Sequence, residues 1–387
     1  MELTHSPATE ALRAEARAWL RDHVPAEPLP SLETREGFAA HREWEARLAA
    51  DRWATVSWPA RYGGRDADLY AWLAFEEEYW AAGAPGRVSQ NGISLLAPTL
   101  FAHGTPEQRD RVLPDMAAGR TVWAQAWSEP EAGSDLAALR SRAVRTSGGW
   151  LLSGQKTWSS RAAFADRAFG LFRSDPGADR PHRGLTYLMF DLRAPGVTVR
   201  PIGRLDGKPA FAELFLDEVF VPDEDVIGEP GQGWRIAMAA TGDERGLTLR
   251  SPGRFLASAD RLAALWRSTA DGAEGGAGVD PALRDRVADA LVGARAYQLF
   301  TWSAAARIAE GGTLGAESSL NKVFWSEYDL ALHETALDLL GPEAERADGE
   351  WAEPWVFSLA GPVYAGTNEI QRDIIAERLL GLPKGRR

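Results

Sequence analysis

Residues 185–192 read LTYLMFDL and residues 214–221 read LFLDEVFV. Both runs are rich in aromatic and other apolar side chains of the kind that favour extended strands. Similar short runs occupy the chain from about 122 to 233, separated by turns such as Ser147-Gly148-Gly149 and Ala194-Pro195-Gly196. No helical pattern interrupts them. The middle of the chain therefore predicts an antiparallel barrel or sandwich rather than a parallel sheet.

The sequence on both sides of this β segment is helical in pattern. Ser6-Pro7 is typical of a helix start, and apolar residues then recur on one helical face. Further helices are predicted from Asp280-Pro281, over about 318–340, and from Thr367. We expect an α+β multidomain protein, consisting of an N-terminal helical domain (1–122), a central antiparallel β-barrel (123–233) and a C-terminal helical bundle (234–387).

Composition excludes several classes of function. The 387 residues carry 43 basic and 55 acidic side chains, a net charge of −12 that argues against nucleic-acid or anionic-membrane binding. The absence of cysteine removes disulfides and thiolate chemistry, and the six histidines lack metal-ligand spacing, so we expect no metal site. The polar N-terminus and the lack of a long apolar run predict a cytoplasmic protein without a membrane span.

The most informative local segment is AQAWSEPEAGSD at residues 124–135. Pro130 and Gly133 favour a tight turn, whose free backbone N–H groups suit an anionic or carbonyl-rich ligand. Trp127, and Trp158 further along the chain, are candidates for flat walls beside that ligand. The alternative interpretation is a structural turn next to two core tryptophans.

Six segments of this chain, in order, resemble the acyl-CoA dehydrogenase family. They are WPARYGG (58–64), FAHGTPEQRDRVLP (101–114), SEPEAGSD (128–135), SGQKTWSS (153–160), VPDEDVIGEPGQGW (221–234) and GTNEIQRDIIAERLLGLP (366–383). The resemblance covers nearly the whole chain. The family's fold consists of a helical domain, a β-barrel and a helical bundle. It matches the helical, β-prone and helical segments described above.

The resemblance implies a bound FAD and an acyl-thioester substrate. A flavin needs an apolar aromatic wall and a few fixed hydrogen-bond donors that tune its electron affinity. By motif position, Ser134 reaches toward the pantetheine arm of the thioester. The cofactor-binding residues implied in the same way are Gln125, Trp127, Ser128, Trp158, Ser160 and Thr367.

The family reaction is α,β-dehydrogenation, in which a carboxylate removes the α-proton while the β-hydrogen leaves as hydride to flavin N5. In much of the family this base is a glutamate one residue before a Gly-Thr, a position that is Ala365 here. Its backbone N–H remains available to the thioester oxygen. Other branches place the base before an arginine on the helix after the barrel, which corresponds to Glu244 and Arg245. We therefore expect Glu244 to be the base and Arg245 to lie beside the substrate; an ordinary solvated ion pair is the alternative.

Two departures from the family pattern lie where family members contact the pyrophosphate and the adenine side of FAD, in part from the neighbouring subunit. The chain lacks an Arg-x-Phe-Gly segment between Ser251 and Asp280, and Asp338 and Pro342 alter a Gln-x-x-Gly-Gly motif. We expect a homodimer or homotetramer, with a heteromer as the alternative, and an electron-transfer flavoprotein as acceptor. Two other functions stay open: a catalytically silent partner subunit, and a monooxygenase that uses reduced flavin.

Overall fold

The computed structural model describes residues 5–245, 252–272, 280–312, 314–346 and 349–384. The chain crosses four times between two compact units. Unit 1 comprises Met1–Pro25, Ala67–Ala84 and Arg245–Arg387, and unit 2 comprises Ala26–Asp66 and Pro85–Glu244.

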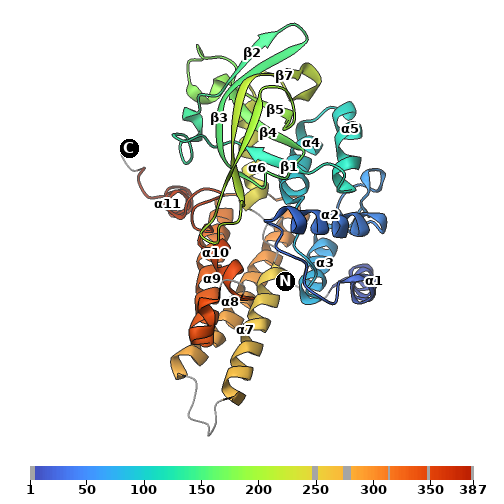
Figure 1. The fold of residues 1–387 in the computed structure, drawn as a ribbon, viewed down its shortest axis with the longest axis vertical. Helices are drawn as coiled ribbons and strands as arrows, with labels where there is room; N and C mark the ends of the chain where they lie inside the picture. The colour runs from blue at the N-terminus through green and yellow to red at the C-terminus, as the bar shows by residue number, and fades with distance from the viewer. Residues whose placement is uncertain (1–4, 246–251, 273–279, 313, 347–348, 385–387) are drawn as a thin grey trace. The chain divides into compact units, whose positions relative to one another are not determined.

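Unit 1 is helical. Its three longest helices, α7, α8 and α9, pack along one another (Figure 1). Phe255, Tyr297 and Trp325, one from each of them, meet in a buried aromatic cluster. The helical elements of this unit are α1 (Pro7–His23), α3 (Leu69–Ala81), α7 (Pro252–Gly272), α8 (Pro281–Ala309), α9 (Glu317–Leu340), η6 (Gly341–Glu345), α10 (Ala352–Ser358), α11 (Asn368–Ile374) and η7 (Ile375–Leu379).

The predicted helix starts are confirmed in unit 1. The Ser6 hydroxyl accepts a hydrogen bond from the Thr9 backbone N–H at 3.1 Å, and Asp280 caps α8 in the same way. Each cap satisfies a donor that has no partner inside its own helix. The C-terminal helix begins after Thr367, as the sequence indicates, and continues as a short π-helix in η7.

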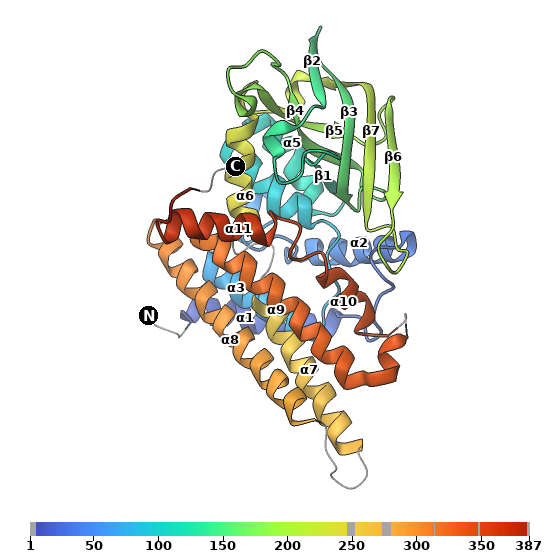
Figure 2. The ribbon, with the colours of Figure 1, turned by 90° about the vertical axis from the view of Figure 1, so that its left-hand side faces the viewer.

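Unit 2 contains an eight-stranded sheet, in which β6, β7, β3 and β2 lie side by side (Figure 2). The strand order is β6-β7-β3-β2-β4-β5-β8, and β1 joins through β4. The strands are β1 (Trp123–Ala126), β2 (Arg142–Thr146), β3 (Gly149–Ser160), β4 (Arg167–Arg173), β5 (Leu185–Asp191), β6 (Val197–Ile202), β7 (Phe211–Pro222) and β8 (Val226–Ile227).

The expected closed antiparallel barrel is corrected in two respects. Among the described residues the sheet path ends at β6 and β8 without closing, and β8 has only two residues before a helix follows. The sheet is also mixed, because β1 and β2 each pair with β4 in the parallel direction. All other strand pairs are antiparallel, so the central β segment itself is confirmed.

Helices complete unit 2, in which they both precede and follow the strands. Apolar side chains from β2 to β8 form its main core, which includes Leu152, Phe172 and Leu214. No helix in the described ranges is long and apolar enough to cross a membrane. The helical elements of this unit are α2 (Arg35–Ala50), η1 (Ala60–Tyr62), η2 (Gly92–Leu96), α4 (Ala97–His103), α5 (Pro106–Ala117), η3 (Leu136–Ala138), η4 (Pro181–Gly184), η5 (Asp223–Asp225) and α6 (Gly233–Arg245).

Candidate active site

Strand β1 places the first of the predicted site residues. Gln125 pairs with Phe169, and Ala126 pairs with Gly170, in parallel register with β4. A Cβ atom on Gly170 would lie 2.3 Å from the Ala126 carbonyl oxygen, so this close backbone approach requires glycine. Gln125 and the residues after β1 are thereby held against the centre of the sheet.

The predicted tight turn follows β1 directly. Glu129 and Ala132 exchange two backbone hydrogen bonds of 3.1 and 3.0 Å. The Thr157 backbone N–H donates to the Ser128 carbonyl at 2.9 Å, which ties the turn to β3. Ser134 lies beyond the turn and is exposed. The turn therefore brings two separate sequence motifs, residues 128–135 and 153–160, into contact.

Two donors beside this turn have no protein partner. Trp127 is 7% exposed, and its indole N–H is buried without a hydrogen bond. The Gln125 side-chain amide nitrogen is buried without a partner as well. The two residues are two positions apart on β1 and just after it, so both donors are compatible with one ligand rich in acceptors. The isoalloxazine ring of a flavin is such a ligand.

Trp158 supplies an exposed aromatic surface from β3. Its side chain is 60% exposed, and its φ is +60°, a conformation uncommon for any residue other than glycine. The pairing of β3 with β7 shifts register between Lys156 and Ser159, and this irregularity accommodates Trp158. The indole makes an edge contact with Phe211, whose backbone pairs with Ser160. Strained, exposed aromatic residues are typical of functional sites.

The remaining predicted contacts belong to unit 1. Ala365 has φ +56°, and its carbonyl accepts a 3.3 Å hydrogen bond from the Gln371 side chain. The Thr367 hydroxyl accepts a hydrogen bond from the Ile370 backbone N–H and caps α11. The loop is thus fixed from both sides. Ala365 carries only a methyl group, which cannot accept a proton.

The candidate base occupies the last turn of α6. Glu244 and Arg245 are helical, but their side chains lie outside the described residues. Asp338 forms an ion pair with Arg286, whose guanidinium donates to Asp338 Oδ2 at 2.6 Å. Its charge is therefore matched locally.

The described part of the chain gathers no group of three or more His, Asp or Glu side chains that could hold a metal.

A buried ion pair lies behind the turn, and sequence reasoning missed it. Lys156 is fully buried and Glu129 nearly so, with 2.8 Å between Nζ and Oε1. Burial lowers the pKa of Lys156 to about 8, against the opposing pull of the carboxylate. Burial also opposes ionisation of Glu129, but Lys156 and the backbone donors outweigh it and hold its pKa below the ordinary value. Both are charged at neutral pH. A lysine within a β-prone run was the available signal.

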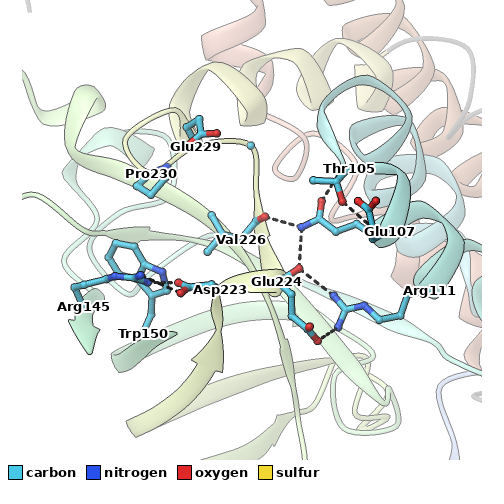
Figure 3. Close-up of a pocket in the computed structure, with 12 residues that line it drawn as sticks. Thr105, Glu107, Arg111, Arg145, Trp150, Asp223, Glu224, Val226, Glu229 and Pro230 are labelled. Carbon is cyan, nitrogen blue, oxygen red and sulfur yellow. Dashed lines mark hydrogen bonds and ion pairs between the residues drawn. The ribbon is translucent and has the colours of Figure 1, made fainter. Parts of the chain in front are cut away.

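Unit 2 also contains a groove of about 770 Å³, which Figure 3 shows beside the start of α5. None of the predicted site residues line it. Several of its polar groups bind one another: Gln108 donates to the Val226 carbonyl, Arg111 pairs with Glu224, and Arg145 pairs with Asp223 (Figure 3). The groove is thus a joint between α5 and the strand ends rather than a second set of free ligand-binding groups.

Family models match three consecutive parts of the chain. The acyl-CoA dehydrogenase N-terminal domain matches residues 6–120, the middle domain matches residues 124–219, and the C-terminal domain matches residues 231–380.

Individual relatives match along their whole length. The chain is 39% identical to acyl-CoA dehydrogenase IpdE1 of Mycobacterium tuberculosis strain H37Rv, over 97% of this chain and 98% of the relative. A solved structure titled Tcur3481-Tcur3483 steroid ACAD aligns with a TM-score of 0.85, 28% identity and full coverage of both chains. The ChsE4-ChsE5 complex from Mycobacterium tuberculosis aligns with a TM-score of 0.82 and 30% identity, again over both full chains.

Proposed function

This chain belongs to the acyl-CoA dehydrogenase family, and from that premise we propose that it introduces an α,β double bond into an acyl-CoA thioester. As a member of the family it is an oxidoreductase that acts on acyl-CoA and uses FAD. We assign residues 1–122, 123–233 and 234–387 to its three domains, a division that the three family-model matches support.

The observation that carries the proposal is the pair of orphaned donors on Gln125 and Trp127, together with the exposed indole of Trp158 on a strand that is hydrogen-bonded to the same turn. These groups match what a flavin requires: hydrogen-bond donors for its ring acceptors and an aromatic surface to lie on. When bound here, FAD would supply the acceptor for the hydride that leaves the β-carbon. The residues that would hold it are Gln125, Trp127, Ser128, Trp158, Ser160 and Thr367.

Removal of the α-proton requires a base. Position 365 cannot supply it, because alanine has no group that accepts a proton. We assign Glu244 as the base because it is the carboxylate next to Arg245 at the end of α6. A carboxylate on a protein helix removes a weakly acidic proton efficiently only when its pKa is raised and the developing enolate is stabilised. The backbone N–H of Ala365 is assigned to the thioester oxygen, whereas Ser134 and Arg245 are assigned to the rest of the substrate.

The base assignment is tested by anaerobic reduction of the bound flavin. Wild-type protein should be yellow and should bleach when an acyl-CoA substrate is added. In Glu244→Gln the bleaching rate should fall by about 10²–10⁴, the usual contribution of a general base. Asp243→Asn is the matched control, because it removes the adjacent carboxylate in the sequence and leaves Glu244 in place. Wild-type bleaching in Glu244→Gln would overturn the assignment.

The solved relatives support a substrate class. One of them is titled a steroid ACAD. We infer that the acyl group here is steroid-derived, and that such a thioester gives a higher kcat/KM than a linear acyl-CoA of similar carbon number. Equal or greater kcat/KM for the linear thioester would contradict this.

The same relatives support a heteromeric assembly, because two of them are complexes of two named chains. We propose a second acyl-CoA dehydrogenase chain as partner and an electron-transfer flavoprotein as acceptor. Native mass spectrometry of the protein purified from its own host should detect a complex of two different chains. A homo-oligomer that is catalytically active by itself would contradict the proposed partner chain.

A further inference from the structure

We propose that the buried Lys156–Glu129 ion pair positions the two segments of unit 2 that are assigned to FAD, residues 125–128 and 158–160. The inference rests on the proposed function, because it concerns the segments assigned to FAD. Neither side chain is exposed enough to meet a ligand directly. Both therefore act through the backbone groups that they hold.

Lys156 links three strands through one ammonium group. Its Nζ donates to Glu129 Oε1 at 2.8 Å, to the Leu171 carbonyl of β4 at 2.7 Å and to the Trp127 carbonyl after β1 at 3.2 Å. An ammonium has three donors, and all three are used. The Trp127 carbonyl is thereby fixed, and with it the direction in which the chain leaves β1.

Glu129 gathers the other end of the same loop. One carboxylate oxygen accepts from the Arg140 backbone N–H at 2.6 Å, and the other accepts from the Ser141 backbone N–H at 2.9 Å. A charged acceptor with two backbone donors and one ammonium holds the chain more firmly than neutral groups would. The segment that contains Ser134 is therefore held between fixed points at Trp127 and Ser141.

Both residues of the pair lie next to residues assigned to the flavin, which supports a role in FAD binding in addition to one in folding. Glu129 directly follows Ser128, and Lys156 precedes Trp158 by two residues. An apolar pair of the same size is often as stable as a buried ion pair, so stability by itself does not account for the charges. Fixing carbonyls and amides in one arrangement requires directional donors, which apolar side chains lack.

The test compares FAD affinity with folding in variants of the full-length protein. Lys156→Met removes the ammonium and keeps the chain length, and Glu129→Asp keeps the charge but shortens its reach. Glu78→Gln is the matched control: its carboxylate is equally buried at 8% exposure, but its partners are Arg13 and Arg17 on α1. Titration of apoprotein with FAD gives the dissociation constant, and thermal unfolding of apoprotein gives the stability.

We expect both pair variants to weaken FAD binding by about ten-fold or more, the effect of losing one charge-assisted hydrogen bond. The control should lower the unfolding midpoint yet change FAD affinity by less than about three-fold. In the double variant Lys156→Met/Glu129→Gln, where no charge stays buried alone, the midpoint should recover while FAD affinity stays low. If Lys156→Met does not fold, Glu129→Asp decides.

The inference is overturned if the pair variants bind FAD like the wild type, or if Glu78→Gln loses as much affinity as they do. Recovery of affinity together with the midpoint in the double variant would overturn it as well. These outcomes are separate from the proposed dehydrogenation, which fails if wild-type protein holds FAD but is not reduced by any acyl-CoA.

Discussion

Trp123 and Trp158 differ in how far their side chains are exposed, and this difference separates a structural role from a functional one. Trp123 is 2% exposed within β1, whereas Trp158 is 60% exposed on the same sheet. A buried tryptophan contributes several kcal/mol through packing, but an exposed one contributes little to folding. The exposed indole at positive φ is therefore retained for a ligand, in our interpretation the flavin.

We predict that Trp158→Ala separates binding from stability. The free energy of unfolding of the apoprotein should change by about 0.5 kcal/mol or less, because the side chain is largely in water already. The dissociation constant for FAD should rise about ten-fold, since the variant loses an aromatic contact surface. Denaturant unfolding and FAD titration measure the two. Trp123→Ala should instead cost about 3–5 kcal/mol. Unchanged FAD affinity in Trp158→Ala would remove this residue from the site.

At the scale of the element, β1 depends on a single glycine of its neighbour. Gly170 admits the Ala126 carbonyl, as a Cβ there would lie 2.3 Å away. We predict that Gly170→Ala destabilises the protein by about 1–3 kcal/mol, as overpacking does, and weakens FAD binding because β1 carries Gln125. Gly177→Ala is the control: this glycine is exposed, and a Cβ there would have only ordinary contacts. Equal stability of the two variants would contradict the role of Gly170.

The packing of α1 on α3 has a pH dependence of known sign. Burial opposes ionisation of Glu78, but Arg17 and Arg13 outweigh it and hold its pKa below the ordinary 4.5. Such a group adds stability above its ordinary pKa and loses it as the pH falls through the folded value. Glu78→Gln should therefore lower the free energy of unfolding by about 1–3 kcal/mol at pH 7, and this difference should shrink as the pH falls below 4.5 and through the folded pKa. Urea unfolding at a series of pH values from 7 downward checks this; a constant difference would contradict it.

At the scale of the whole molecule, cofactor binding and stability are linked. A ligand that binds the folded chain alone stabilises it by RT ln(1 + [L]/Kd), about 4 kcal/mol at a thousand-fold excess over Kd. We predict that FAD raises the unfolding midpoint of the apoprotein, with a larger rise in the wild type than in Trp158→Ala at equal FAD concentration. Differential scanning calorimetry measures the shift, and no shift at saturating FAD would contradict FAD binding.

The sequence by itself determined what depends on local pattern. Strand-prone runs, helix starts such as Ser6 and Asp280, and the tight turn at residues 128–135 follow from propensities and periodicity that act within a few residues. The motifs also indicated the family, which the comparisons confirmed. The site residues named from those motifs remain predictions, and Glu244 is the one on which the chemistry depends.

Only the tertiary structure decided the contacts between distant segments. It paired Lys156 with Glu129 and Arg286 with Asp338, it placed β1 parallel to β4, and it left the sheet open. It also showed that the Gln125 and Trp127 donors lack partners. The physical reason is that pairing and burial depend on which surfaces meet after folding. Local propensity does not specify which distant residues come into contact. The role of Lys156 could therefore be inferred only once the structure placed it next to Glu129.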